Sequence, residues 1–73
     1  MDPKVAAFNA LRPRLMAVAY RMLGTRSDAE DVLHDAWLRW SSADASAVRS
    51  AEAWLKTTVT RLAIDRLRRA KMS

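Results

Sequence analysis

The sequence lacks most of the residues that cross-link small proteins through disulfides or bound metal ions. Its 73 residues include no cysteine and one histidine, which excludes a disulfide framework, a thiolate metal site and a site built from several histidines. No stretch approaches the roughly 20 uncharged residues of a membrane helix, and the N-terminus lacks a signal-peptide pattern. A chain this short leaves little room for an enclosed pocket. We therefore expect one domain over residues 1–73, with no catalytic site, no metal and no cofactor.

Residues that break helices are also scarce. The chain has one glycine and two prolines, and it is rich in alanine, leucine and arginine, so its composition favours helices throughout. Pro3 suits the first position of a helix. Pro13 lacks a backbone donor and disfavours a helical conformation at Arg12, which predicts a break or kink there. Gly24 suits the left-handed residue that follows many helices.

The spacing of apolar residues predicts an all-α fold, a compact bundle of three main helices plus a short N-terminal helix. The expected helices cover residues 3–11, 13–23, 28–40 and 51–69, with a loop at residues 41–50. Ser27 and Glu30 predict a capping box at the start of the third of these helices. Ser50 is placed to cap the last one, whose C-terminal end is rich in basic residues, as the helix dipole favours.

Charge is unevenly distributed along the chain. A net charge of +5 and a pI near 10.8 allow binding to a polyanion. Residues 1–26 hold five bases and one acid, residues 27–45 hold five acids and one base, and residues 46–73 hold seven bases and two acids. An acidic middle between basic flanks suggests two surfaces for two different partners. Ordinary solvated charge, which the fold brings together and cancels, is the alternative.

The helix expected over residues 28–40 has an unusual polar face. At about 100° per residue, Asp31, His34, Asp35 and Leu38 fall opposite its apolar side. Two carboxylates, an imidazole and an outward leucine suit docking to a basic partner helix, although a solvated face with one exposed leucine is also common. His34 has no nucleophile beside it. Asp31 and Asp35 alone make a weak case for a cation site.

The last helix has the opposite polarity. Its core side is expected to hold Leu55, Val59, Leu62, Ala63 and Leu67. Another face carries an aromatic ring, a hydroxyl and guanidinium groups, and Thr57 and Arg69 lie at its edges. The residues of this face are Trp54, Thr58, Arg61, Asp65 and Arg68. Bases stack on aromatic or guanidinium planes while cations meet phosphates, so this face suits single-stranded nucleic acid. In the alternative, Trp54 caps the core and the arginines only solubilise the helix.

Several blocks of the sequence resemble region 2 of bacterial RNA polymerase sigma factors. The resemblance points to the extracytoplasmic-function group, particularly the subgroup whose full-length members carry an additional C-terminal domain. It covers nearly the whole chain, and its blocks occur in the expected order. These blocks are Arg12–Leu15, Ala19–Gly24, Asp28–Trp40 and Trp54–Arg68.

The resemblance implies a function in transcription initiation through two sites. One would dock on the clamp helices of the RNA polymerase beta-prime subunit, through Asp31, Val32, His34, Asp35 and Leu38. The other would melt the promoter −10 element and bind its non-template strand, with a base flipped from the stack. The residues implied there are Arg49, Trp54, Lys56, Thr57, Thr58, Arg61, Asp65 and Arg68.

The sequence departs from the family pattern at two sites. His34 and Asp35 stand where many members have Gln-Glu, and Arg61 stands where many have asparagine, so Arg61 is expected to alter base preference. The family's second helical domain, which reads the −35 element, is absent from these residues, so we expect a fragment that does not start transcription alone. An anti-sigma factor and the missing C-terminal domains are further partners that the resemblance suggests, and it implies a cytoplasmic, nucleoid-associated location.

Two other functions remain open from the residues alone. A small helical interaction domain, of the adaptor or antitoxin type, would show no preference for single strands over duplex. A helix-turn-helix protein would read the major groove of intact duplex. The loop expected at residues 41–50 is longer than the usual helix-turn-helix turn of about three to four residues, which argues against the second alternative.

Overall fold

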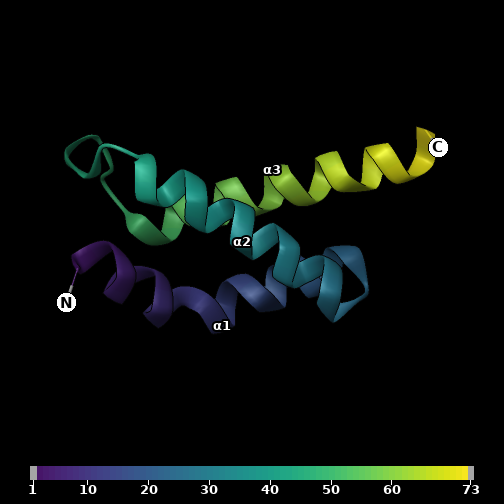
Figure 1. Ribbon diagram of the computed structural model, residues 1–73, viewed down its shortest axis with the longest axis horizontal. Helices are drawn as coiled ribbons and strands as arrows, with labels where there is room; N and C mark the ends of the chain where they lie inside the picture. The colour runs from purple at the N-terminus through teal and green to yellow at the C-terminus, as the bar shows by residue number, and fades with distance from the viewer. Residues whose placement is uncertain (1, 73) are drawn as a thin grey trace.

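Residues 2–72 are described by a computed structural model, and they form three helices that all pack against one another (Figure 1). Helix α1 spans Pro3–Leu23, α2 spans Arg26–Ser42 and α3 spans Ala51–Met72. A short 3-10 helix, η1, covers Ala45–Ala47 in the connection between α2 and α3. No strand occurs within residues 2–72. The predicted all-α bundle is confirmed.

The break predicted at Pro13 is wrong. The helices expected over residues 3–11 and 13–23 are one continuous helix, with Pro13 inside α1. Pro13 and Asn9 are both exposed, so solvent can hydrate the carbonyl that proline leaves without its helical donor. Phe8 and Leu15 on either side are buried in the same core. This shared packing keeps the helix continuous despite the missing hydrogen bond.

The turn between α1 and α2 contains one correct prediction and one error. Gly24 ends α1 with a φ of +83°, the left-handed conformation that favours glycine. Helix α2 then begins earlier than expected, because the Thr25 hydroxyl caps it by accepting a hydrogen bond from the backbone N–H of Asp28 at 3.2 Å. The capping box of Ser27 and Glu30 is therefore wrong. Glu30 pairs instead with Arg26 at 3.0 Å.

The other helix ends lie close to their predicted positions. Helix α2 extends to Ser42, and η1 occupies the middle of the expected loop. Helix α3 begins at Ala51, where the Ser50 hydroxyl accepts the N–H of Ala53 at 3.2 Å. This confirms the predicted N-terminal cap. At its other end α3 continues to Met72, three residues beyond the predicted end.

The core lies along the centre of the three helices. Alanines among its members allow the helix backbones to approach closely. Leu67, expected on the core side, is 40% exposed. The last turns of α3 project beyond the α1–α2 turn (Figure 1). The buried residues are Phe8, Leu15, Ala19, Ala29, Val32, Leu33, Ala36, Trp40, Leu55, Val59 and Ala63.

Candidate nucleic-acid interface

An open groove lies where α2 ends and α3 begins. Its volume is about 580 Å³, and the side chains that line it come from α2, from the connection before α3 and from the first turns of α3. We call it the arginine groove. It is lined by Arg39, Ala47, Val48, Arg49, Ser50, Ala53, Trp54, Thr57, Thr58 and Arg61.

The groove is strongly positive. Arg39, Arg49 and Arg61 line it, and no carboxylate is among its lining residues in the part of the chain that the structure describes. Within residues 2–72, none of these three guanidinium groups forms an ion pair. Their donors are therefore available to an anion, and guanidinium groups match the geometry of phosphate oxygens.

Trp54 gives the groove an aromatic wall. The side chain is half-buried, and its ring centroid lies 5.4 Å from that of Trp40 at an interplanar angle of 51°. Thr58, one turn later, donates its hydroxyl hydrogen to the Trp54 carbonyl at 2.9 Å. Trp54 thus combines the two roles considered for it, because its ring packs on the core and still lines the groove.

The groove brings together five of the eight residues predicted to bind DNA: Arg49, Trp54, Thr57, Thr58 and Arg61. The other three lie outside it. Lys56 is exposed and shares a shallow depression on the outer face of α3 with Thr57 and Arg61. Asp65 lines a smaller cleft between α2 and α3. Arg68 is exposed farther along α3.

Arg39 is the charged groove residue that the sequence did not predict. It is the single base in the acidic segment, and it was counted only as part of that segment's charge. In the structure it is exposed and lines both the arginine groove and the small cleft that contains Asp35 and Asp65. Its helical phase, one turn after Asp35 on the edge facing α3, was the available signal.

The connection before α3 is held by its own hydrogen bonds. The Asp44 carboxylate accepts the hydroxyl of Ser46 at 2.7 Å and the N–H of the same residue at 3.0 Å. These two bonds lower the pKa of Asp44 below its ordinary value of 3.8, and the nearby charge of Lys4 adds to the effect. Asp44 therefore caps η1, from which Ala47 lines the groove.

The predicted docking surface lies on the exposed side of α2. Asp31, His34, Asp35 and Leu38 are exposed, Leu38 by 51%, and we call these four residues the acidic ridge. Val32 was assigned to the same surface, but it is 2% exposed and belongs to the core. Val32 therefore offers almost no surface to a partner, and its contact with the polymerase stays a prediction.

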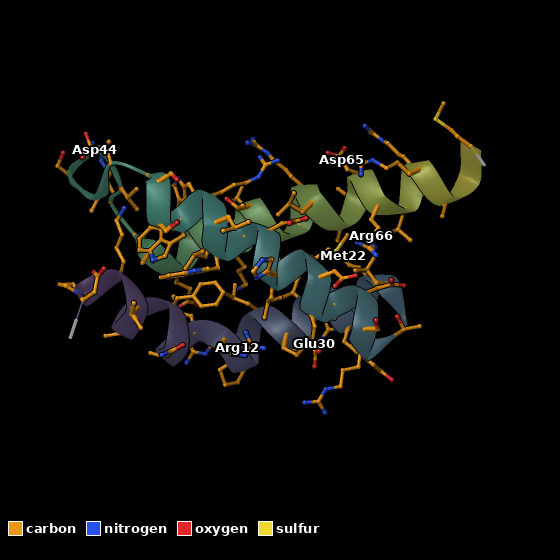
Figure 2. All side chains as sticks on the ribbon, viewed as in Figure 1. Arg12, Met22, Glu30, Asp44, Asp65 and Arg66 are labelled. Atoms are coloured by element: carbon orange, nitrogen blue, oxygen red, sulfur yellow. The ribbon has the colours of Figure 1, made fainter. Side chains whose placement is uncertain are left out.

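The carboxylates of the ridge differ in their surroundings. Asp31 lies 3.1 Å from Nη2 of Arg66, which also bonds Asp28 at 3.1 Å. Arg66 points from α3 into the space between α3 and the beginning of α2 (Figure 2). Asp35 forms no ion pair within residues 2–72. His34 faces the opposite edge of α2, where it lines a groove shared with α1.

Two further features bear on what the chain can bind. Among residues 2–72, no three histidine, aspartate or glutamate side chains are grouped so that they could hold a metal ion. None of the helices in this described part has both the length and the apolar character needed to cross a bilayer.

Comparisons with known proteins agree with the resemblance. Residues 7–72 match the family described as Sigma-70 region 2. The chain is 52% identical over 67 residues to the ECF RNA polymerase sigma factor SigJ of Mycobacterium tuberculosis, covering 92% of this chain and 21% of that relative. It is 33% identical over 69 residues to the probable ECF RNA polymerase sigma factor SigI from two strains of that species, covering 94% of this chain and 24% of the relative. The chain thus spans about a fifth to a quarter of these relatives' length. No solved structure matches it.

Proposed function

The chain belongs to the sigma-70 region 2 family, and on this premise we propose that it is a transcription-initiation module with two binding surfaces. The acidic ridge docks on the clamp helices of the RNA polymerase beta-prime subunit. The arginine groove holds the promoter −10 element as an unpaired non-template strand. The role is one of binding, and no covalent step is assigned to any residue.

The observation that supports the nucleic-acid surface most directly is the composition of the arginine groove. Three unpaired guanidinium groups lie around one tryptophan ring and two threonine hydroxyls. Flipping a base from the stack costs a few kcal/mol, whereas each base stacked on an aromatic side chain returns roughly 1–3 kcal/mol. Contacts between arginine and phosphate add to this return, so an unpaired strand is favoured over a stacked duplex.

The docking proposal rests on the exposed centre of the acidic ridge. Leu38 is 51% exposed beside Asp35, whose carboxylate has no ion-pair partner within residues 2–72. An apolar contact beside an unpaired carboxylate suits a basic amphipathic helix. Asp31 takes part as well, although its carboxylate is shared with Arg66. The partner's cation must therefore join or displace that guanidinium group.

The two surfaces adjoin. Arg39 lines the arginine groove and also the cleft that contains Asp35. A polymerase bound on the ridge would therefore hold the groove beside its own surface. An unpaired strand captured there lies next to the enzyme that will copy its complement.

Two binding measurements with this chain test the proposal. Fluorescence anisotropy with a short oligonucleotide containing a −10-like sequence should show tighter binding as a single strand than as a duplex. Co-purification with core polymerase should retain the chain on the enzyme, and competition with isolated clamp helices should release it. Equal affinity for strand and duplex would favour a duplex reader or a merely solvated basic helix. Failure to co-purify would remove the docking assignment.

A further inference from the structure

Lys4 lies in the first turn of α1, but its side chain reaches the end of α2. Its Nζ donates to the carbonyls of Trp40 at 3.0 Å and Ser41 at 3.2 Å, and also to that of Ala43. The indole N–H of Trp40 donates in return to the Lys4 carbonyl at 3.0 Å. We call this reciprocal arrangement the Lys4 clasp. It joins segments that are 36 or more residues apart in the sequence.

The clasp places a cation against the carbonyls at the end of α2, of which the Trp40 carbonyl also accepts the backbone N–H of Ala43 at 3.2 Å. The last carbonyls of an α-helix have no intrahelical donor, and the helix dipole favours a cation there. All three hydrogens of the Lys4 ammonium have acceptors, and Nζ lies 5.7 Å from the centroid of the Trp40 ring. The side chain is half-buried, so these interactions are less screened than those of a surface lysine.

The clasp lies directly behind the arginine groove. Trp40, which the clasp holds, packs its ring on that of Trp54, which lines the groove. Ala43 begins the connection that carries Asp44, the cap of η1, and the groove residues Val48 and Arg49. Figure 2 shows Asp44 at the end of the molecule where α1 begins. The clasp therefore holds both the Trp40 ring behind the groove and the start of the connection at residues 43–50, which we call the groove wall.

Few other contacts hold this wall. Between residues 43 and 50, only Ala43 and Val48 are half-buried, and all others are exposed. A segment with so little burial opens locally at low cost in free energy. Among the described residues, the bond from the Lys4 ammonium to the Ala43 carbonyl joins this connection to α1, and its donor is charged, which strengthens it.

We propose that Lys4 is a positioning residue for binding of the unpaired strand. This inference rests on the proposed function. Lys4 does not line the groove, so it acts by keeping Trp40 and residues 43–50 in the arrangement that the strand requires. If loss of the clasp leaves about one molecule in ten with the wall in place, the apparent affinity falls about tenfold, because it scales with the competent fraction.

Lys4→Met, which keeps the aliphatic stem, tests the proposal against Arg21→Met. Arg21 is an exposed base at the other end of α1, with no ion pair within residues 2–72, so both variants lose one charge from the same helix. Anisotropy with a single-stranded oligonucleotide should show about tenfold weaker binding for Lys4→Met and near-parental binding for Arg21→Met. Trp40→Phe removes the indole donor together with part of the ring that packs on Trp54, and should weaken binding by at least about threefold.

Two further readouts separate positioning from direct contact and from unfolding. Because Lys4 meets no phosphate in the proposal, the slope of log affinity against log salt should stay at the parental value, whereas loss of a phosphate contact lowers it by about one. Hydrogen exchange should speed up at residues 44–49 while the helix amides keep their protection. Far-UV circular dichroism at the same temperature should match the parent.

The possible results are distinguishable. The inference is overturned if the parent binds the strand and Lys4→Met binds as tightly as Arg21→Met. A salt slope reduced by about one in Lys4→Met would make Lys4 a phosphate contact, and affinity lost only together with helicity would make it a purely structural residue. A parent chain with no preference for single strands overturns the proposed function and the inference together.

Discussion

The acidic ridge and the arginine groove are built in different ways. The ridge is a stripe along one helix, and every member projects from the exposed side of α2. The groove combines the end of α2, the connection before α3 and the first turns of α3, and tryptophan packing supports it from behind. A single-helix surface depends only on that helix being folded. A composite surface also depends on how its segments pack, so substitutions far from the ligand can affect it.

The largest effect should come from the packing behind the groove. Trp40→Ala removes a side chain that is 4% exposed, together with its contact to Trp54 and its hydrogen bond to Lys4. Truncation of a buried tryptophan costs about 3–5 kcal/mol, comparable with the whole stability of so small a domain. Urea denaturation followed by circular dichroism should find most molecules unfolded without denaturant.

The matched variant lies on the ridge. Leu38→Ala truncates a large apolar side chain only two residues away, but one that is 51% exposed. Its free energy of unfolding should stay within about 0.5 kcal/mol of the parent. Equal destabilisation by the two variants would contradict the distinction between a surface that depends on packing and one that does not.

The next effect concerns the groove's direct contacts with the strand. Arg61→Ala should weaken single-strand binding about tenfold and lower the salt slope by about one, because one phosphate contact is lost. Co-purification with core polymerase should be unchanged. Arg68→Ala removes the same charge from an exposed position outside the groove, and its effect should be smaller. If titrations at two salt concentrations rank Arg68 above Arg61, the strand follows the outer face of α3 instead.

The corresponding test of the ridge reverses one unpaired charge. Asp35→Lys should weaken binding to isolated clamp helices about fivefold to tenfold, as expected for a charge placed against like charge, and leave the helical signal unchanged. Asp31→Lys should also lose binding, with a small loss of stability because its bond to Arg66 is broken. Unchanged affinity of both variants in a pull-down would show that the partner does not meet this side of α2.

The same contrast explains what the sequence could predict. Helical periodicity was enough to predict that the members of the ridge share one exposed face, because a single helix carries them all. It also put Trp54, Thr58 and Arg61 on one face of α3. Val32 entered the docking set only through the resemblance, and the structure buries it in the core. The fold class followed from composition and spacing.

Tertiary packing determined what the sequence could not predict. Arg39 joins the groove only because α2 ends beside the first turns of α3. The Lys4 clasp links residues 36 or more positions apart, and no local sequence pattern indicates it. Pro13 stays within α1 because Phe8 and Leu15 are buried in one core, a case in which packing outweighs local propensity.

The smallest effect should come from the cap of the groove wall. Bonds from Ser46 lower the pKa of Asp44 below 3.8, so its ionised form is favoured in the folded chain. The resulting stabilisation is fully present above the unfolded pKa and is lost as the pH falls through the lower folded pKa. Ser46→Ala removes the hydroxyl donor, so an NMR titration of the Asp44 carboxyl carbon should show a pKa raised toward its ordinary value, but not fully, because the backbone N–H remains. An unchanged titration would mean that Asp44 holds the wall without help from the Ser46 hydroxyl.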